Sequence, residues 1–524
     1  MNLELLTALH ERLPQYLGGH IALSVSALAV AAAVSLPLGV LAARSERVAA
    51  PVLTVAAVMQ TIPNLALLAL MVTVLGGRIG FWPAFVALTL YAVLPIVRNT
   101  IVGLQSVPAP VREAAQGLGM SRVQMLLRVE APLAAPTIIA GLRTATVWVV
   151  GAATLATPVG ADSLGNYIFT GLQLQIWEWV LFGCLFAAGF AILLDQAMRA
   201  VDVSVREKQA RPGLIALAAV ILLPTGLILS APGGERSAGA AATADDRLWP
   251  DGVSRDLIVG AKGFAEQNIL SRLIADELTA AGARVDVRES LGSAFAFQAL
   301  RTGQIDVMVD YTGTIWDVYM ERPAPVPRAQ MFIEACHWLQ SNHSVTCLGR
   351  LGFENAYEIA VRSAFAEAHG LETISDLNSV DVFRLGYDNE FPQRPEAERL
   401  FDRYGLDQRR DTEIEPGLRY QAARQGGIDA FLAFGTDAQL ISDEFQILRD
   451  DQGAFPAYDA VVLLSERAAS IPAVVQALEP LMGRIDARLM IEANAVMVIE
   501  QRSAREAAQR LRGDLFPEAA DAQE

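Results

Sequence analysis

Lysine is the residue this sequence most conspicuously lacks, with only Lys208 and Lys262 among 41 basic residues. A phosphate-binding loop needs a lysine that follows glycine and precedes serine or threonine, because its ammonium group contacts the bound phosphates. Lys208 is followed by Gln209 and Lys262 by Gly263, so neither fits this pattern. The sequence therefore excludes a P-loop nucleotide hydrolase within this chain.

Cysteine is also scarce, with three residues in a chain of 524. Three cysteines make no disulfide framework, although Cys336 and Cys347 could pair if their part of the chain lies in an oxidising compartment. His337, His343 and His369 lack the spacing of metal ligands, and no nucleophile–base arrangement or paired-carboxylate motif stands out. We therefore predict no metal, no cofactor and no enzymatic activity in this chain.

Charge and apolar residues are distributed unevenly along the chain. Residues 1–211 carry 13 Lys and Arg against 10 Asp and Glu, whereas the remainder carries 28 against 47. The first part consists of long apolar runs, and the second has the mixed texture of a soluble domain. Acidic surface residues of this kind usually serve solubility. The composition predicts a membrane domain followed by a soluble domain, and no nucleic-acid partner.

Apolar segments long enough to cross about 30 Å of hydrocarbon define the first part. Six are present, at about 20–41, 52–75, 82–103, 136–158, 179–198 and 213–231. We expect an all-α membrane domain with five core spans over residues 1–205, and a sixth span or anchor over 206–231. The Gly/Ala/Pro-rich residues 232–254 then form a flexible linker with a reach of roughly 25 Å, which leads to a soluble domain over 255–524.

Basic residues in the short loops predict the orientation, because loops rich in Lys and Arg stay in the cytoplasm. The loops after the first, third and fifth spans hold most of them: Arg44, Arg47, Arg98, Arg112, Arg122, Arg128, Arg199, Arg206, Lys208 and Arg211. The N-terminus and the soluble domain then face outward, which in a Gram-negative cell is the periplasm. Residues 1–19 lack the features of a signal peptide. The sixth span resembles one in mid-chain; we expect it to be retained as an anchor, with cleavage as the alternative.

Strand patterns alternate with helix patterns from Leu257 onward. Strands are predicted at 257–263, 285–290 and 305–311, helices at 265–281 and 293–302, and a terminal helix at about 494–512. This order is typical of an α/β domain with a parallel-rich sheet. About 260 residues suit two lobes with a ligand cleft between them.

The loop between the third and fourth spans reads EAAQGLGMSRVQMLLRVEAP, residues 113–132. The residues of its first part favour a helix, and Gly117 and Gly119 then interrupt the helical pattern. Ser121 is suited to be the N-cap of a second short helix. The loop resembles the coupling loop of binding-protein-dependent ABC permeases, with Ala131 where leucine is usual. The matching positions are Glu113, Ala114, Ala115, Gly119, Val129 and Pro132. An ordinary amphipathic surface helix is the alternative.

The resemblance to these permeases covers residues 17–200 and includes MQTIPNLALLAL at 59–70 and LYAVLPIVRNT at 90–100. In that family the coupling loop enters a groove on an ATPase subunit. The resemblance therefore implies a separate ATPase subunit, in agreement with the missing P-loop. It also implies a multi-pass protein of the cell inner membrane that forms a homodimer, because one set of five core helices is half of a translocation pathway.

The soluble part carries a second set of motifs. They are GAKGFAEQNIL (260–270), GQIDVMVDYTGT (303–314), GFENAYEIAV (352–361), GYDNEFPQRPE (386–396) and GAFPAYDAVVLL (453–464). These segments resemble the binding proteins of glycine betaine, choline and carnitine importers, over nearly all of 256–510. The resemblance implies a two-lobed periplasmic binding protein of type II.

A quaternary ammonium group has no N–H to donate. Proteins therefore bind it with aromatic faces, each of which attracts the cation by ~0.5–2 kcal/mol. The resemblance implies such a cage at Tyr311, Tyr357 and Tyr458, with Phe434 where tyrosine is usual. The alternative for each residue is ordinary half-buried packing.

The other end of a betaine is a carboxylate, which favours charged and hydroxyl donors. The resemblance places Lys262, Thr314 and Arg394 at this polar end. Lys262 is one of only two lysines in a chain rich in arginine, which supports a site that favours a compact ammonium.

The two resemblances together imply the permease and substrate-binding subunit of an ATP-driven importer for a quaternary-ammonium compound. Glycine betaine, choline and carnitine are the candidate solutes, and an ergothioneine importer of the same architecture is the alternative. Phe434 argues against the simplest betaine site. A ligand-gated channel or receptor with a clamshell sensor is the alternative from another class, and the coupling loop argues against it.

Overall fold

The computed structural model describes residues 3–174, 177–207, 248–250, 252–322, 326–388, 391–414 and 418–517. The chain divides into two compact units. The first holds residues 1–169 and 178–234, and the second holds residues 170–177 and 235–524. The predicted sixth span at 213–231 lies outside the described residues, as does the predicted linker up to residue 247.

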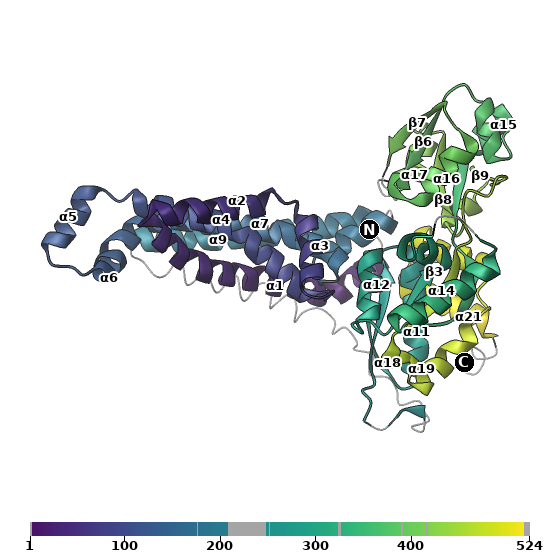
Figure 1. Ribbon diagram of the computed structural model, residues 1–524, viewed down its shortest axis with the longest axis horizontal. Helices are drawn as coiled ribbons and strands as arrows, with labels where there is room; N and C mark the ends of the chain where they lie inside the picture. Colours follow the sequence, from purple (N-terminus) through teal and green to yellow (C-terminus); the bar gives the residue numbers. More distant parts are fainter. Residues whose placement is uncertain are drawn as a thin grey trace. The chain divides into compact units, whose positions relative to one another are not determined.

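Long apolar helices build the first unit. They are α1 (Leu3–Ala43), α2 (Glu46–Thr61), α3 (Asn64–Val74), α4 (Phe81–Gln105), α7 (Ala131–Ala153), α8 (Gly165–Leu174) and α9 (Trp177–Glu207). Among the described residues, four stretches are long and apolar enough to cross a membrane: Arg12–Ala43, Phe81–Gln105, Arg122–Val159 and Trp177–Ser204. They coincide with the predicted first, third, fourth and fifth spans. Helix α4 packs against α1, α2 and α7 along the bundle (Figure 1).

The predicted second span at 52–75 is not one straight helix. It consists of α2 and α3, which meet at an angle of 103°. Pro63 lies at the break, and proline has no N–H to donate and forces the preceding residue out of the helical region. Accordingly, Ile62 is extended, with ψ of 124°. The pair forms either one broken span or a re-entrant loop.

Close helix contacts and an ion pair between α7 and α9 help to hold the bundle together. A Cβ on Gly141 of α7 would lie 2.5 Å from the Cβ of Asn99 in α4, so this position needs glycine for the helices to approach. Arg143 of α7 donates two hydrogen bonds to Asp195 of α9, at 2.8 and 2.9 Å. Both charges are therefore paired inside an apolar unit, where an unpaired charge would be costly.

A projecting elbow connects α4 to α7. It contains α5 (Ala109–Gly117), α6 (Arg122–Met125) and a short π-helical turn from Leu126 to Glu130, and it lies at the end of the bundle away from α3 (Figure 1). Gly119 has φ of 74°, which favours glycine and allows the reversal between the two helices. Ser121 caps α6 in a reciprocal capping box with Gln124. The predicted pair of short helices around a glycine is confirmed.

The second unit consists of two α/β lobes. Lobe 1 has the strand order β2-β1-β3-β10-β4, and lobe 2 has the order β7-β6-β8-β5-β9. The strands are β1 (Asp256–Lys262), β2 (Arg284–Leu291), β3 (Val307–Tyr311), β4 (Thr346–Glu354), β5 (Tyr357–Arg362), β6 (Phe383–Tyr387), β7 (Arg409–Glu413), β8 (Ala430–Phe434), β9 (Phe445–Leu448) and β10 (Asp459–Leu464).

The two sheets are mixed rather than fully parallel. In each sheet one strand runs antiparallel to both neighbours: β10 in lobe 1 and β5 in lobe 2. These are the two strands that the chain enters directly after passing from one lobe to the other. The first crossover joins β4 to β5 and the second joins β9 to β10. Such a return strand depends on the path between the lobes, which no local sequence pattern encodes.

Helices cover both sheets. Lobe 1 contains α11 (Ala265–Ala280), α12 (Ser293–Arg301), α14 (Arg328–His343), α19 (Pro472–Leu478), α20 (Ala487–Val498) and α21 (Ala504–Leu515), and lobe 2 contains α15 (Ser363–His369), α16 (Pro395–Tyr404) and α17 (Arg419–Arg424) (Figure 1). The single terminal helix predicted at 494–512 is wrong, because the chain breaks between α20 and α21. Gln501 has φ of 55° there, and Ser503 forms a capping box with Glu506 that starts a new helix.

Cys336 of α14 and Cys347 of β4 form a disulfide. The sequence left this pairing open. The bridge ties a surface helix to the edge strand of lobe 1, and such bridges are typical of proteins exposed to an oxidising compartment.

Candidate solute-binding site

An aromatic cluster gathers around Tyr357, the first residue of β5. The centre of its ring lies 5.1 Å from that of Phe434, 5.6 Å from Phe391, 5.8 Å from Tyr458 and 6.1 Å from Phe455. Tyr357 pairs with Phe434 across the β5–β8 ladder, which fixes the two rings side by side. Three of the four predicted cage residues are therefore brought together.

Phe391 and Phe455 were missed by the sequence reasoning. Both lie inside segments that carried the resemblance, GYDNEFPQRPE and GAFPAYDAVVLL. An aromatic residue within a ligand-binding motif was the available signal. The resemblance transferred only the tyrosine positions and their one phenylalanine replacement, so it gave no reason to add them.

The fourth predicted cage residue, Tyr311, lies at the end of β3 and contacts a different set of groups. Its ring stacks at 6.3 Å on Phe264, and its hydroxyl accepts a hydrogen bond from Gln267 at 3.1 Å. The turn that follows Tyr311 reaches the aromatic cluster. A Cβ on Gly313 would lie 2.5 Å from the Tyr458 ring, so only glycine allows this approach.

A buried carboxylate, Glu266 of α11, connects Tyr311 to both crossover regions. It accepts hydrogen bonds from the Tyr311 hydroxyl, the Asn355 amide and the Thr436 hydroxyl. Asn355 lies in the first crossover, and its backbone N–H donates to Tyr458 in the second. Burial raises the pKa of Glu266 to about 7, in spite of these three donors. Glu266 was also missed, because an acidic residue at the start of a helix is usually a solvated one.

The raised pKa of Glu266 predicts a pH dependence of folding stability. The folded protein holds this proton up to about pH 7, whereas the unfolded chain loses it near its ordinary pKa, so stability is lost as pH rises between the two values. The effect is about 3 kcal/mol. Asp317 and Glu358, with pKa values raised by burial to about 6 and about 7, act in the same direction.

The measurement is the urea midpoint of the C-terminal unit, read by pulse proteolysis of the full chain between pH 5 and pH 8. The midpoint should fall with rising pH, and Glu266→Gln should flatten this slope. Glu398→Gln, which changes an exposed carboxylate, is the control and should keep the slope of the unmodified protein. An unchanged slope in Glu266→Gln would contradict the assignment.

The predicted polar end is divided between the lobes. Lys262 is buried at the end of β1, and its ammonium lies 2.5 Å from Asp310 and 5.7 Å from the centre of the Tyr311 ring. Thr314 is buried in the turn after Tyr311. Arg394 belongs to lobe 2, and its guanidinium carbon lies 5.7 Å from the centre of the Tyr357 ring. The Asp310 carboxylate partly neutralises Lys262, so this lysine contributes less net charge than the sequence suggested.

Buried polar contacts bridge the two lobes beside the aromatic cluster. Asp317 of lobe 1 accepts a hydrogen bond from Arg399 of α16 in lobe 2 at 2.5 Å, and the exposed fractions of these side chains are 0% and 10%. The Arg399 Nε also donates to the Ala454 carbonyl at 3.1 Å. The Tyr458 hydroxyl donates to Glu396, also in α16. These contacts therefore connect the two lobes beside the aromatic cluster.

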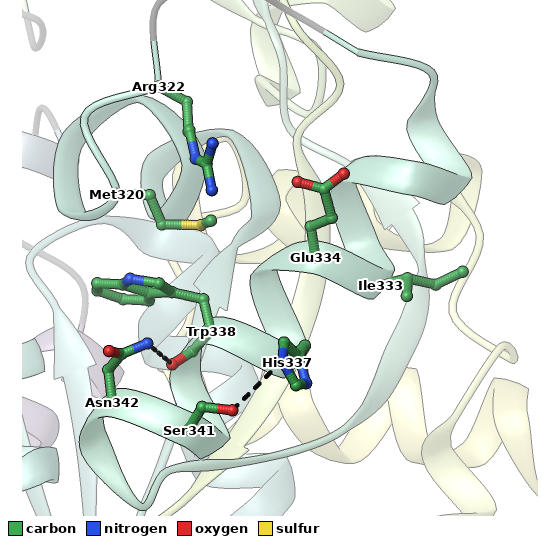
Figure 2. Close-up of a pocket in the computed structure, with 8 residues that line it drawn as sticks. All are labelled: Met320, Arg322, Ile333, Glu334, His337, Trp338, Ser341 and Asn342. Atoms are coloured by element: carbon green, nitrogen blue, oxygen red, sulfur yellow. Dashed lines mark hydrogen bonds between the residues drawn. The ribbon is translucent and has the colours of Figure 1, made fainter.

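A shallow pocket of about 250 Å³ lies elsewhere, on lobe 1. It is lined by Met320, Arg322, Ile333, Glu334, His337, Trp338, Ser341 and Asn342 (Figure 2). It shares no residue with the aromatic cluster. Among the described residues, no group of three or more His, Cys, Asp or Glu side chains could hold a metal ion.

Comparison with known proteins assigns each of the two units to a protein family. Residues 255–511 match the substrate binding domain of the ABC-type glycine betaine transport system, and residues 35–207 match the binding-protein-dependent transport system inner membrane component. An ergothioneine transport permease/ergothioneine binding protein of Helicobacter pylori is 30% identical over 487 residues, which span 89% of this chain and 84% of that protein. The chain belongs to the family of ABC importers in which permease and solute-binding protein are fused.

Relatives of the permease part alone are also similar. A choline transport system permease protein of Bacillus subtilis is 39% identical over 183 residues, or 35% of this chain and 83% of that protein. A glycine betaine/carnitine/choline transport system permease protein of the same organism is 39% identical over 191 residues, or 36% of this chain and 87% of that protein. The predicted fold class, a helical permease followed by a type II binding protein, is confirmed, and so is the predicted role as a transport subunit of an importer.

Proposed function

We propose that this importer subunit captures a quaternary-ammonium solute with its C-terminal unit and passes it through its helical unit. The observation that carries the proposal is the cluster of Phe434, Phe391, Phe455 and Tyr458 around Tyr357. Such a concentration of aromatic faces suits a cation that cannot donate hydrogen bonds. The names of the relatives point to the same class of solutes, namely ergothioneine and choline in two of them.

Titration calorimetry with the purified full-length protein tests the proposal. Glycine betaine, choline, carnitine and ergothioneine are titrated separately. At least one should bind in the micromolar range or tighter. If none of the four produces heat, and none shifts the melting temperature of the protein, then the proposed class of solutes is wrong.

We propose further that a separate ATPase subunit engages the elbow around Gly119, in a complex with two copies of this chain. The sequence has no P-loop lysine, so the energy source must be another polypeptide. The elbow presents exposed apolar side chains on a compact projection, with Leu118 78% exposed and Val123 64% exposed. Exposed apolar residues of this kind mark protein contacts. In this arrangement the elbow faces the cytoplasm and the C-terminal unit faces the periplasm.

A charge on the elbow is expected to uncouple transport from binding. Leu118→Glu places a carboxylate where the ATPase groove would have to desolvate it, which costs several kcal/mol. Uptake of the solute should fall at least tenfold, while the Kd of the purified protein for the solute should stay within twofold. Reconstituted uptake with ATP and calorimetry measure the two quantities. Uptake that persists without any ATPase would instead favour the ligand-gated channel.

A further inference from the structure

Glu396 in the first turn of α16 has an unusual environment. It is completely buried, with an exposed fraction of 0%. One of its carboxylate oxygens accepts a hydrogen bond from the Tyr458 hydroxyl. The other oxygen, Oε2, has no hydrogen-bond partner within the part of the chain that the structure describes. A buried acceptor without a donor costs about 1–3 kcal/mol, and more when the group is charged.

The neighbouring charges do not satisfy this oxygen. The Arg399 guanidinium is directed to Asp317, at 2.5 Å, and to the Ala454 carbonyl. The Arg394 guanidinium carbon lies 5.7 Å from the centre of the Tyr357 ring. Neither guanidinium donates to the Oε2 of Glu396.

The position of Glu396 relates it to the solute site. Its partner Tyr458 belongs to the aromatic cluster, where its ring stands at 88° to that of Tyr357 with 5.8 Å between the ring centres. The carboxylate of Glu396 is therefore linked, through the Tyr458 hydroxyl, to the aromatic faces that are proposed to hold the ammonium group. A donor group on a solute held by these faces would therefore be a suitable partner for this oxygen.

We infer that Glu396 is a specificity-determining residue, whose free oxygen accepts a hydrogen bond from an N–H or O–H donor on the solute. This inference rests on the proposed function. The preferred solutes are then quaternary-ammonium compounds that carry a hydroxyl group or a ring N–H. Compounds without a donor, such as glycine betaine, leave the buried oxygen unpaired. A site built to pair with such a donor discriminates strongly against an analogue that lacks it.

Matched pairs of solutes that differ only in the donor test this inference on the full-length protein. Choline is compared with propyltrimethylammonium, carnitine with γ-butyrobetaine, and ergothioneine with the analogue methylated on both ring nitrogens. In the unmodified protein, the donor-bearing member of the pair that binds best should bind at least tenfold more tightly. The pair that shows this preference also identifies the donor as a hydroxyl or as a ring N–H.

Glu396→Gln should abolish the preference. Its side-chain carbonyl can still accept from Tyr458, so its NH₂ group faces the position of the free oxygen and repels a donor there. The ratio of the two Kd values should fall from at least tenfold to about one. The control is Glu398→Gln on an exposed face of the same helix, which should keep the ratio of the unmodified protein.

The outcomes separate this inference from the proposed function. If the unmodified protein binds these solutes without a preference for the donor-bearing member, the inference is wrong and the proposed function stands. The same holds if Glu396→Gln binds with an unchanged ratio. If the unmodified protein binds none of the six compounds but binds glycine betaine, the inference is wrong and the proposed function stands; if it binds neither the six compounds nor glycine betaine, both are wrong. The comparison in the unmodified protein needs no variant, so a variant that fails to fold does not remove the test.

Discussion

Replacing Tyr357 by leucine is expected to weaken binding of choline, or of whichever quaternary-ammonium solute binds best, by about 100-fold. Tyr357 is 5% exposed and contacts four other rings of the cluster. Leucine fills much of the same volume but has no π face. The variant loses one direct cation–π contact of up to about 2 kcal/mol and the alignment of the neighbouring rings, which together correspond to about 100-fold in Kd.

The neutral isostere of choline, 3,3-dimethyl-1-butanol, distinguishes cation recognition from packing. It has the shape of choline without the charge, so Tyr357→Leu should reduce its affinity much less than that of choline. Tyr357→Phe keeps the π face and should bind choline within about threefold of the unmodified protein. If the leucine variant weakened both ligands by the same factor, then Tyr357 would contribute shape alone, and the cation–π interpretation would fail.

The elements that the sequence predicts well depend on local patterns. The four straight spans follow from apolar length, and the elbow follows from Gly119 and the capping residue Ser121. The bend in the second span was also visible in the sequence, because Pro63 excludes a continuous helix. The segment predicted as one span is therefore bent at this proline, as one broken span or as a re-entrant loop.

The parts of the site that the sequence did not predict depend on contacts between distant residues. Glu266 accepts a hydrogen bond from Thr436, 170 residues away, and Glu396 accepts one from Tyr458, 62 residues away. Both glutamates occur within recognised motifs, yet an acidic residue is mostly exposed and gives no sign of burial in a sequence. The aromatic positions could be transferred because the resemblance named them. The carboxylates that surround them became visible only when the lobes were placed together.

Removing Arg399 is expected to have the second large effect, because Arg399 stabilises the bridged arrangement of the lobes. In Arg399→Met, Asp317 remains at 0% exposure without its cation. Breaking a buried pair in this way costs about 3–5 kcal/mol. The cost applies when the lobes are bridged, and it is relieved when they separate and water reaches Asp317. We propose that solute binding needs the bridged state, and the Kd should then rise at least 100-fold.

This defect should depend on pH in a direction that identifies Asp317 as its cause. Burial raises the pKa of Asp317 to about 6 even with Arg399 present, and loss of the cation raises it further. Protonation neutralises the stranded carboxylate, so Arg399→Met should bind the solute more weakly at pH 8 than at pH 5, by a larger factor than the unmodified protein does. The double variant Asp317→Asn/Arg399→Met should recover part of the affinity and lose this pH dependence.

Arg424→Met, which breaks an exposed pair with Glu444 within lobe 2, should change the Kd less than threefold, because exposed pairs contribute at most about 1 kcal/mol. An equal loss in Arg424→Met and Arg399→Met, or no recovery in the double variant, would show that the buried pair does not control lobe closure.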